Sequence, residues 1–130
     1  MGRQSGFSFI EVLVVAAIIG ILGLIAVPQY SAYRERAYNS AALDDLKSLA
    51  RAQERFFEGN ASYKAIEHCF NVDAEGRCAV DGLPGMQSLS KGVSVSVTAS
   101  QSGFVATAKH VKGSKTCTWD STKGGLVGCS

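Results

Sequence analysis

The most prominent feature of the chain is one long apolar run near its N-terminus. From Phe7 to Val27 the only polar side chains are those of Ser8 and Glu11. As a helix this run is roughly 30 Å long, which is enough to cross the hydrocarbon core of a bilayer. Pro28 follows and removes one backbone donor, which weakens a helix without necessarily ending it. We therefore expect a membrane-spanning helix that continues past Pro28.

The residues after Pro28 keep a helical period but become amphipathic. Apolar side chains recur at steps of three, four and seven, and charged residues fall between them. They are Leu43, Leu46, Leu49, Ala50 and Phe57. Gly59 and Asn60 are a typical stop signal. The pattern predicts one helix from about Phe7 to Glu58, roughly 75 to 80 Å long at 1.5 Å per residue.

Beyond the helix the pattern lapses and then changes to a period of two. Residues 59–92 contain glycine, a proline and scattered apolar side chains, so we expect an irregular connection. Apolar residues alternate with their neighbours over 93–99 and 104–109, as in half-buried strands. Segments 116–120 and 126–129 flank Lys123-Gly124-Gly125 and are typical of a hairpin. The prediction is an α+β fold, with the amphipathic half of the helix packed on an antiparallel sheet of three to four strands.

The charge and the cysteine content limit the functions and the compartments that the chain can have. Thirteen Lys and Arg residues against eleven Asp and Glu give a formal net charge of +2, so no nucleic-acid-binding stripe is indicated. The four cysteines are Cys69, Cys78, Cys117 and Cys129. All four lie beyond the apolar run, which favours an oxidising compartment, the periplasm or the cell exterior.

Disulfides explain these cysteines better than a metal does. Zinc ligands usually lie two to four residues apart, whereas Cys69 precedes Cys78 by nine positions and Cys117 precedes Cys129 by twelve. Of the three connectivities that four cysteines allow, we favour these two pairs, because the second brackets the predicted hairpin. Closing each short loop contributes roughly 2.5 to 3 kcal/mol on the chain-entropy model.

Nothing in the sequence indicates catalysis. His68 and His110 lack a nearby nucleophile pattern, and we expect both to be surface or loop residues. The sequence therefore predicts no enzyme, and no catalytic, metal or cofactor site. Asn60-Ala61-Ser62 matches the glycosylation sequon, a three-residue pattern that often occurs by chance.

The residues before the apolar run are arranged unlike a secretory signal peptide. Such a peptide has basic residues first, then a shorter apolar stretch, and then a small-residue cleavage site. Here a polar segment from Met1 to Gly6 carries one basic residue, Arg3, and the small Gly6 precedes the apolar run. A cut after Gly6 would leave the apolar helix attached and would give Phe7 a free amino group.

Glu11 is the residue of the apolar run that is least favourable inside a membrane. An ionised acid in hydrocarbon costs about 2.5 to 3.5 kcal/mol on insertion scales, so we expect it to have a partner. No cationic residue follows within the run. Phe7 lies four residues earlier, on the same helical face, so a free amine at Phe7 would supply a counter-ion.

At these residues the chain resembles the type IV pilin family. The resemblance rests on Gly6-Phe7-Ser8-Phe9-Ile10-Glu11, Gly20 and Pro28-Gln29-Tyr30-Ser31-Ala32-Tyr33-Arg34. It covers roughly Ser5 to Tyr38, and the C-terminal half matches only in architecture. Ser8 and Phe9 depart from the threonine and leucine often found in the family, and a leader with Arg3 alone is less basic than many.

The resemblance implies a processing step and an assembly contact. A prepilin peptidase would cut between Gly6 and Phe7 and methylate the new amine of Phe7. Glu11 would then pair with the amine of a neighbouring subunit. The expected division is a leader at 1–6, a membrane-spanning and filament-core helix at 7–28, and a globular pilin domain at 29–130. The subunit would wait in the inner membrane before an assembly machinery builds it into a homo-oligomeric filament outside the cell.

Other interpretations of the apolar run stay open. It could be an ordinary signal anchor, the helix of a type II secretion pseudopilin, or the anchor of a periplasmic binding module. The role of the filament is also open between motility, adhesion, DNA uptake and electron transfer. Electron transfer would use aromatic side chains whose simpler role is packing. They are Tyr30, Tyr33, Tyr38, Phe57 and Tyr63.

Overall fold

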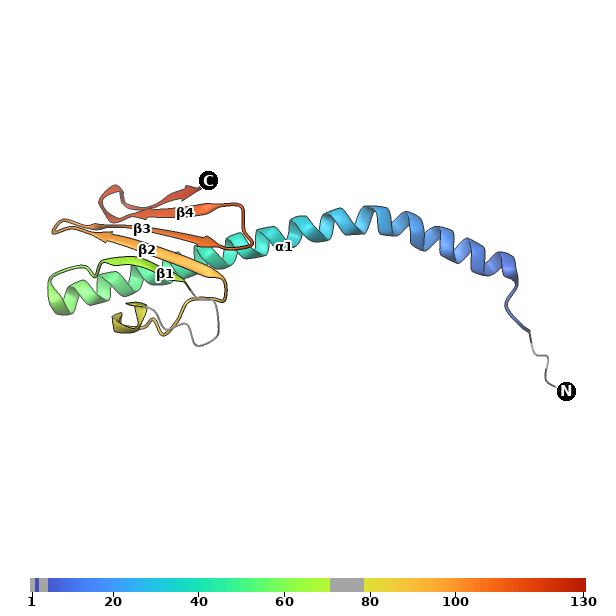
Figure 1. Ribbon diagram of the computed structural model, residues 1–130, viewed down its shortest axis with the longest axis horizontal. Coiled ribbons are helices and arrows are strands. Elements are labelled where there is room, and N and C mark those ends of the chain that lie inside the picture. The colour runs from blue at the N-terminus through green and yellow to red at the C-terminus, as the bar shows by residue number, and fades with distance from the viewer. Residues whose placement is uncertain (1, 3–4, 71–78) are drawn as a thin grey trace. The chain divides into compact units, whose positions relative to one another are not determined.

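The computed structural model describes residues 2, 5–70 and 79–130, which divide into two compact units, Met1–Arg34 and Glu35–Ser130. One α-helix, α1 (Phe9–Asn60), runs through both. Five strands follow in the second unit: β1 (Ile66–Phe70), β2 (Val93–Ala99), β3 (Phe104–His110), β4 (Thr116–Asp120) and β5 (Gly125–Cys129) (Figure 1). Two short 3-10 turns, Ala79–Gly82 and Ser121–Lys123, complete the regular structure of the described residues.

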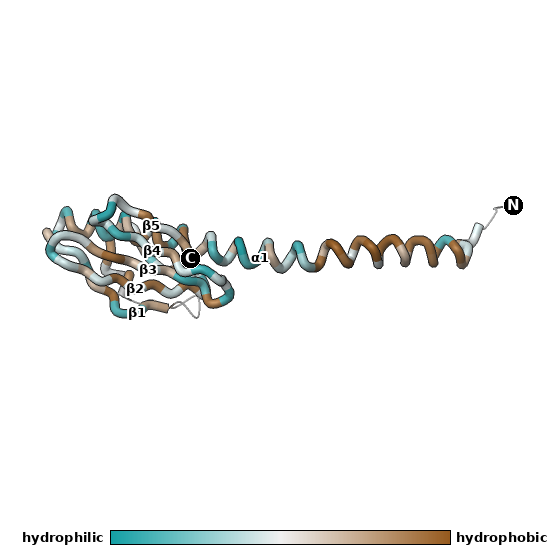
Figure 2. Tube along the Cα trace, turned by 90° about the horizontal axis from the view of Figure 1, so that it is seen from above, coloured by the Kyte–Doolittle hydropathy of each residue, from teal (hydrophilic) through white to brown (hydrophobic). Residues whose placement is uncertain are grey.

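The predicted long helix is confirmed, with both ends shifted by two residues. It starts at Phe9 because the Ser8 N–H donates to Glu11 Oε2 at 2.8 Å, as in a capping box. It ends at Asn60 because Ala61 adopts a left-handed φ of 52°. Pro28 lies inside the helix without ending it. Figure 2 shows that the residues of its first half are mostly hydrophobic and that hydrophilic residues become frequent after it.

The sheet is fully antiparallel, in the order β1-β2-β3-β4-β5. The α+β class is confirmed, but five strands form where three to four were expected, because the connection predicted over 59–92 contains β1. The register of β1 against β2 shifts between Ile66 and Cys69, so the two inward side chains lie three residues apart. A search for strict alternation cannot detect such a bulged strand. Residues 71–78 of that connection lie outside the described part.

One hydrophobic core joins the second half of α1 to the inner face of the sheet. Leu46 and Leu49 are fully buried together with alternate residues of β2 and β3. The predicted face is therefore confirmed at these positions, although Leu43 and Phe57 are only half-buried. Gln53 is buried as well, since its Nε2 donates to the Lys64 carbonyl at 2.7 Å and its Oε1 accepts from the Lys64 N–H at 2.9 Å.

A disulfide joins the two C-terminal strands. Cys117 on β4 pairs with Cys129 on β5, twelve residues later and directly opposite in the register. The second predicted pair is confirmed. Closing this loop contributes roughly 2.5 to 3 kcal/mol. The predicted link of Cys69 to Cys78 includes a residue outside the described part and stays a prediction.

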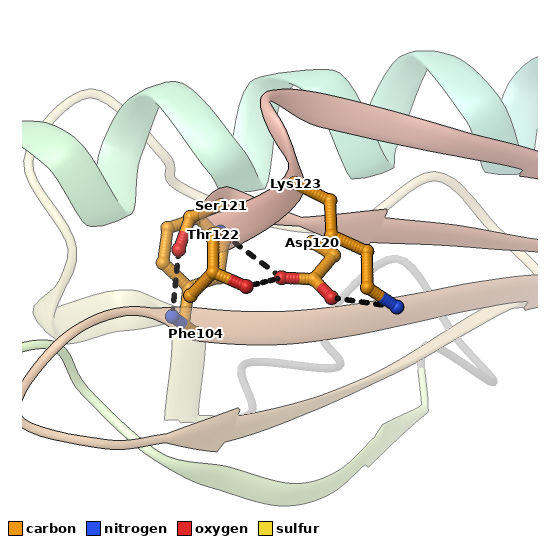
Figure 3. A network of polar contacts seen from close by, with 5 residues as sticks. All are labelled: Phe104, Asp120, Ser121, Thr122 and Lys123. Atoms are coloured by element: carbon orange, nitrogen blue, oxygen red, sulfur yellow. Dashed lines mark hydrogen bonds and ion pairs between the residues drawn. The ribbon is translucent and has the colours of Figure 1, made fainter.

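Asp120 organises the turn between β4 and β5 (Figure 3). Its Oδ1 accepts hydrogen bonds from the Thr122 hydroxyl at 2.6 Å and the Thr122 N–H at 3.0 Å. Lys123 Nζ lies 3.5 Å from Oδ2. The Thr122 hydroxyl, more than the backbone N–H or Lys123, holds the pKa of Asp120 below its usual value, although desolvation opposes this.

Replacing Asp120 by asparagine should therefore destabilise the chain in a pH-dependent way. A carboxyl whose pKa is lower when folded adds stability above its unfolded pKa, near 3.9, and loses it as the pH falls through the folded value. The urea midpoint of Asp120→Asn should lie below that of the parent at pH 7, and the two should converge toward pH 2. Asp44→Asn, at an exposed carboxylate on α1, is the matched control. A constant gap from pH 7 to 2 would contradict this role.

Candidate assembly site at the start of the apolar helix

The expected cleavage position lies just before the first helical residue. Gly6 and Phe7 are exposed and precede Phe9, where α1 begins. A Cβ built on Gly6 meets no atom within 4 Å. The fold of this chain therefore does not require a glycine at that position, and a requirement for one must come from a molecule that acts on it.

Glu11 lies in an apolar groove of about 380 Å³ that it forms with Phe7, Ile10, Val14 and Val15. Its Oε2 accepts the Ser8 N–H, and its own N–H donates to the Ser8 carbonyl at 3.1 Å. Within the described residues no donor bonds to Oε1. The carboxylate thus caps its own helix through one oxygen and leaves the other available to a further donor.

The first unit exposes an unusual amount of apolar surface. Every large aliphatic or aromatic side chain from Phe7 to Val27 is at least 47% exposed. Contiguous apolar surface on this scale marks a membrane or protein contact. Over this segment α1 is also long and apolar enough to cross a membrane, judged by length and composition.

Comparison with known proteins agrees with this arrangement. Residues 1–27 match the family model described as the prokaryotic N-terminal methylation motif. Over 143 aligned residues the chain is 30% identical to the type IV major fimbrial protein FimA of Dichelobacter nodosus, with 98% of this chain and 88% of that protein covered. The chain belongs to the type IV pilin family.

Two other relatives match over shorter segments. The pilin is 43% identical over 61 residues to the type IV major pilin protein PilA of Myxococcus xanthus, which covers 47% of the pilin and 28% of that protein. It is 35% identical over 65 residues to the type II secretion system core protein G of Pseudomonas aeruginosa, covering 50% of the pilin and 46% of that protein. These matches span less than half of either relative, so of these three proteins only FimA supports membership over nearly the whole chain.

The aromatic residues singled out in the sequence occupy different surroundings. Tyr30 and Tyr33 of the first unit are 64% and 70% exposed, and the Arg34 guanidinium lies 5.7 Å from the Tyr30 ring centre. In the second unit Phe57 stacks on Tyr63, with ring centres 4.6 Å apart. Electron transfer through these rings stays a prediction.

Tyr63 belongs to a small aromatic cluster with Phe57 and Phe104. Its ring centre lies 4.9 Å from that of Phe104, which the sequence pattern predicts only as part of a strand. Desolvation, reinforced by the neighbouring carboxylate of Glu54, raises the pKa of the Tyr63 hydroxyl. In the second unit, then, Phe57 and Tyr63 pack against each other and against the sheet.

The prediction for His110 is wrong. His68 is exposed on β1 as expected, but His110 is only 5% exposed and stacks on Tyr38, with ring centres 4.3 Å apart. It ends β3 at the register position opposite Val93, where the alternation turns side chains toward α1. If the alternation of buried and exposed residues in β3 is continued two residues beyond Ala108, residue 110 falls on the buried face, so this pattern could have predicted the burial of His110.

Proposed function

We propose that this pilin is the structural subunit of a type IV pilus. A prepilin peptidase cuts the precursor between Gly6 and Phe7 and methylates the new amine, and the subunits then polymerise through the first half of α1. The observation that carries the proposal is the exposed apolar surface of residues 7–27, with the Glu11 carboxylate in a groove that also contains Phe7.

Hydrophobic burial and charge pairing have different roles in assembly. Fully burying one large aliphatic or aromatic side chain contributes roughly 1.5 to 3 kcal/mol, so the apolar surface of the helix supplies cohesion between subunits. Such burial is non-directional and does not fix how far one subunit is shifted along its neighbour. A charge pair between Glu11 and the Phe7 amine of a neighbour fixes this register, because a misplaced subunit leaves both charges buried and unpaired.

The precursor is held in the inner membrane before assembly. Its apolar helix has the length needed to span a bilayer. The hydrocarbon core of that bilayer holds no water to solvate the Glu11 carboxylate. The globular unit carries the Cys117–Cys129 disulfide, which forms in an oxidising compartment. An assembly machinery then transfers the subunit into a filament outside the cell.

The nearest rival is a type II secretion pseudopilin, since part of the chain also resembles a core protein G. Agreement with FimA over 98% of the chain favours the pilus. Long surface fibres that contain the protein would support the pilus, whereas a confined periplasmic filament would support the rival. A membrane-anchored binding module would give only monomers on cross-linking.

Gly6 provides a decisive test of processing. Mass spectrometry of the parent protein should find an N-methylated Phe7 as the first residue. Gly6→Leu should remain uncleaved, because the peptidase site must admit a residue without a side chain. Gly2→Leu is the matched control, since a Cβ at Gly2 also meets no atom within 4 Å. Normal cleavage of Gly6→Leu, or an unmethylated mature N-terminus in the parent, would contradict the proposal.

A further inference from the structure

His110 is bonded to two neighbouring segments in a way that assigns its proton. Nε2 lies 3.0 Å from the Lys91 carbonyl oxygen, which can only accept, so Nε2 carries the hydrogen. Nδ1 accepts from the Lys112 N–H at 3.0 Å, so Nδ1 carries none. The fold therefore uses one neutral tautomer of this imidazole, as donor and acceptor at once.

The ring also joins α1 to the end of the sheet. Its face stacks on Tyr38 at an interplanar angle of 17°. Gly92, with a left-handed φ of 82°, passes so close that an added Cβ would lie 2.8 Å from Nε2. The Val111 N–H donates to the Gly92 carbonyl at 2.8 Å and links the same segments. His110 is thus fixed between α1, the segment before β2 and the segment after β3.

We propose that His110 is an acid-sensitive latch that holds the Tyr38 region of α1 on the β2–β3 end of the sheet. Protonation places a hydrogen on Nδ1 that faces the Lys112 N–H, so an acceptor becomes a second donor and the bond is lost. Protons can reach the ring, because it lines a pocket of about 570 Å³ together with Phe70 and Val111. The latch is closed while Nδ1 accepts the Lys112 N–H and opens when Nδ1 gains a proton.

The charged groups around the ring carry both signs. Lys91 and Lys112 line the same pocket as His110. On α1, the carboxylate of Asp45 interacts electrostatically with His110. However, Asp45 already accepts from the Ser90 N–H at 2.6 Å and the Ser90 hydroxyl at 2.9 Å, and desolvation raises its pKa. Both oxygens of Asp45 are therefore already engaged by Ser90.

The two histidines of the chain provide a matched experiment. Full-length protein in detergent micelles would be unfolded in urea at pH 7.5 and 5.5, with the single tryptophan as the probe. The unfolding equilibrium constant of the parent should rise by about tenfold on acidification, the effect of one lost hydrogen bond. His110→Asn, whose side-chain oxygen can accept the Lys112 N–H without titrating, should remove this dependence. His68→Asn, at the exposed histidine, should retain it.

Hydrogen exchange tests the latch without a substitution. In the parent, protection of the Lys112 N–H, corrected for the intrinsic exchange rate, should fall by about tenfold between pH 7.5 and 5.5. Protection of the Phe104 N–H, which donates to the Ser121 hydroxyl at 2.8 Å at the other end of β3, should change much less. Unchanged protection of Lys112, or a pH dependence lost with His68→Asn and kept with His110→Asn, would overturn the proposal.

Discussion

Cells that carry Glu11→Ala should accumulate cleaved pilin in the inner membrane and display few or no fibres. The proposed cleavage acts on one chain at Gly6 and Phe7, so removal of the Glu11 carboxylate should leave it largely intact. The proposed assembly brings the Phe7 amine of each subunit into an apolar filament core, where without Glu11 its charge would be unpaired. Breaking a buried pair by removing one partner costs about 3 to 5 kcal/mol, roughly a hundredfold or more in the association of each subunit.

A second variant separates the two roles of this side chain. In the single chain, Glu11 Oε2 also accepts the Ser8 N–H and caps α1. Glu11→Gln keeps an oxygen for that bond but removes the charge, so it should fail to assemble much as Glu11→Ala does. Glu11→Asp keeps the charge at shorter reach and should be milder. Normal fibres from Glu11→Gln would show that capping, and not charge pairing, is what the filament needs.

The measurement compares two cell fractions. Membrane and sheared-surface material would be quantified by immunoblot, and fibres would be counted by electron microscopy. The N-terminus of the membrane-held Glu11→Ala protein would be read by mass spectrometry, so that a processing defect is not mistaken for an assembly defect. Wild-type numbers of Glu11→Ala fibres would leave hydrophobic burial as the only supported assembly force.

Regular periodicity explains what the sequence could predict of the fold. The strand expected over 93–99 is β2 without change, since Val93, Val95 and Val97 alternate with serine and threonine on a half-buried surface. The hairpin with Cys117 and Cys129 was equally predictable from its turn residues. Strand β1 was not, because its bulge breaks the period of two and its pairing depends on β2, more than twenty residues later.

The candidate assembly site could be proposed from the sequence because its residues lie near one another along the chain. Gly6, Phe7 and Glu11 are close in sequence, so a local motif and the cost of a buried charge were enough to find them. His110 and Gln53 depend instead on tertiary neighbours. His110 bonds to the Lys91 carbonyl, 19 residues away, and Gln53 to the Lys64 carbonyl, 11 residues away, and only the folded chain brings these groups within reach. Propensity and period carry no information about such contacts.

Leu46→Ala should strongly destabilise the globular unit. Leu46 is fully buried on α1 within the core formed with β2 and β3. Replacing a buried leucine by alanine costs about 2 to 5 kcal/mol, as lost transfer energy and an unfilled cavity. Domains of this size are stable by only about 5 to 15 kcal/mol, so the loss is a large share of the total.

Leu43→Ala is the matched control, because Leu43 lies on the same helix but is only half-buried. Urea unfolding of the full chain in detergent should show a loss of about 1 kcal/mol for Leu43→Ala and at least twice that for Leu46→Ala. Equal losses would mean that α1 is not anchored to the sheet through Leu46. Neither change touches Gly6, Phe7 or Glu11, so both proteins should be cleaved normally. A fall in Leu46→Ala fibres with cleavage intact would then trace to the folding of the globular unit and not to the assembly helix.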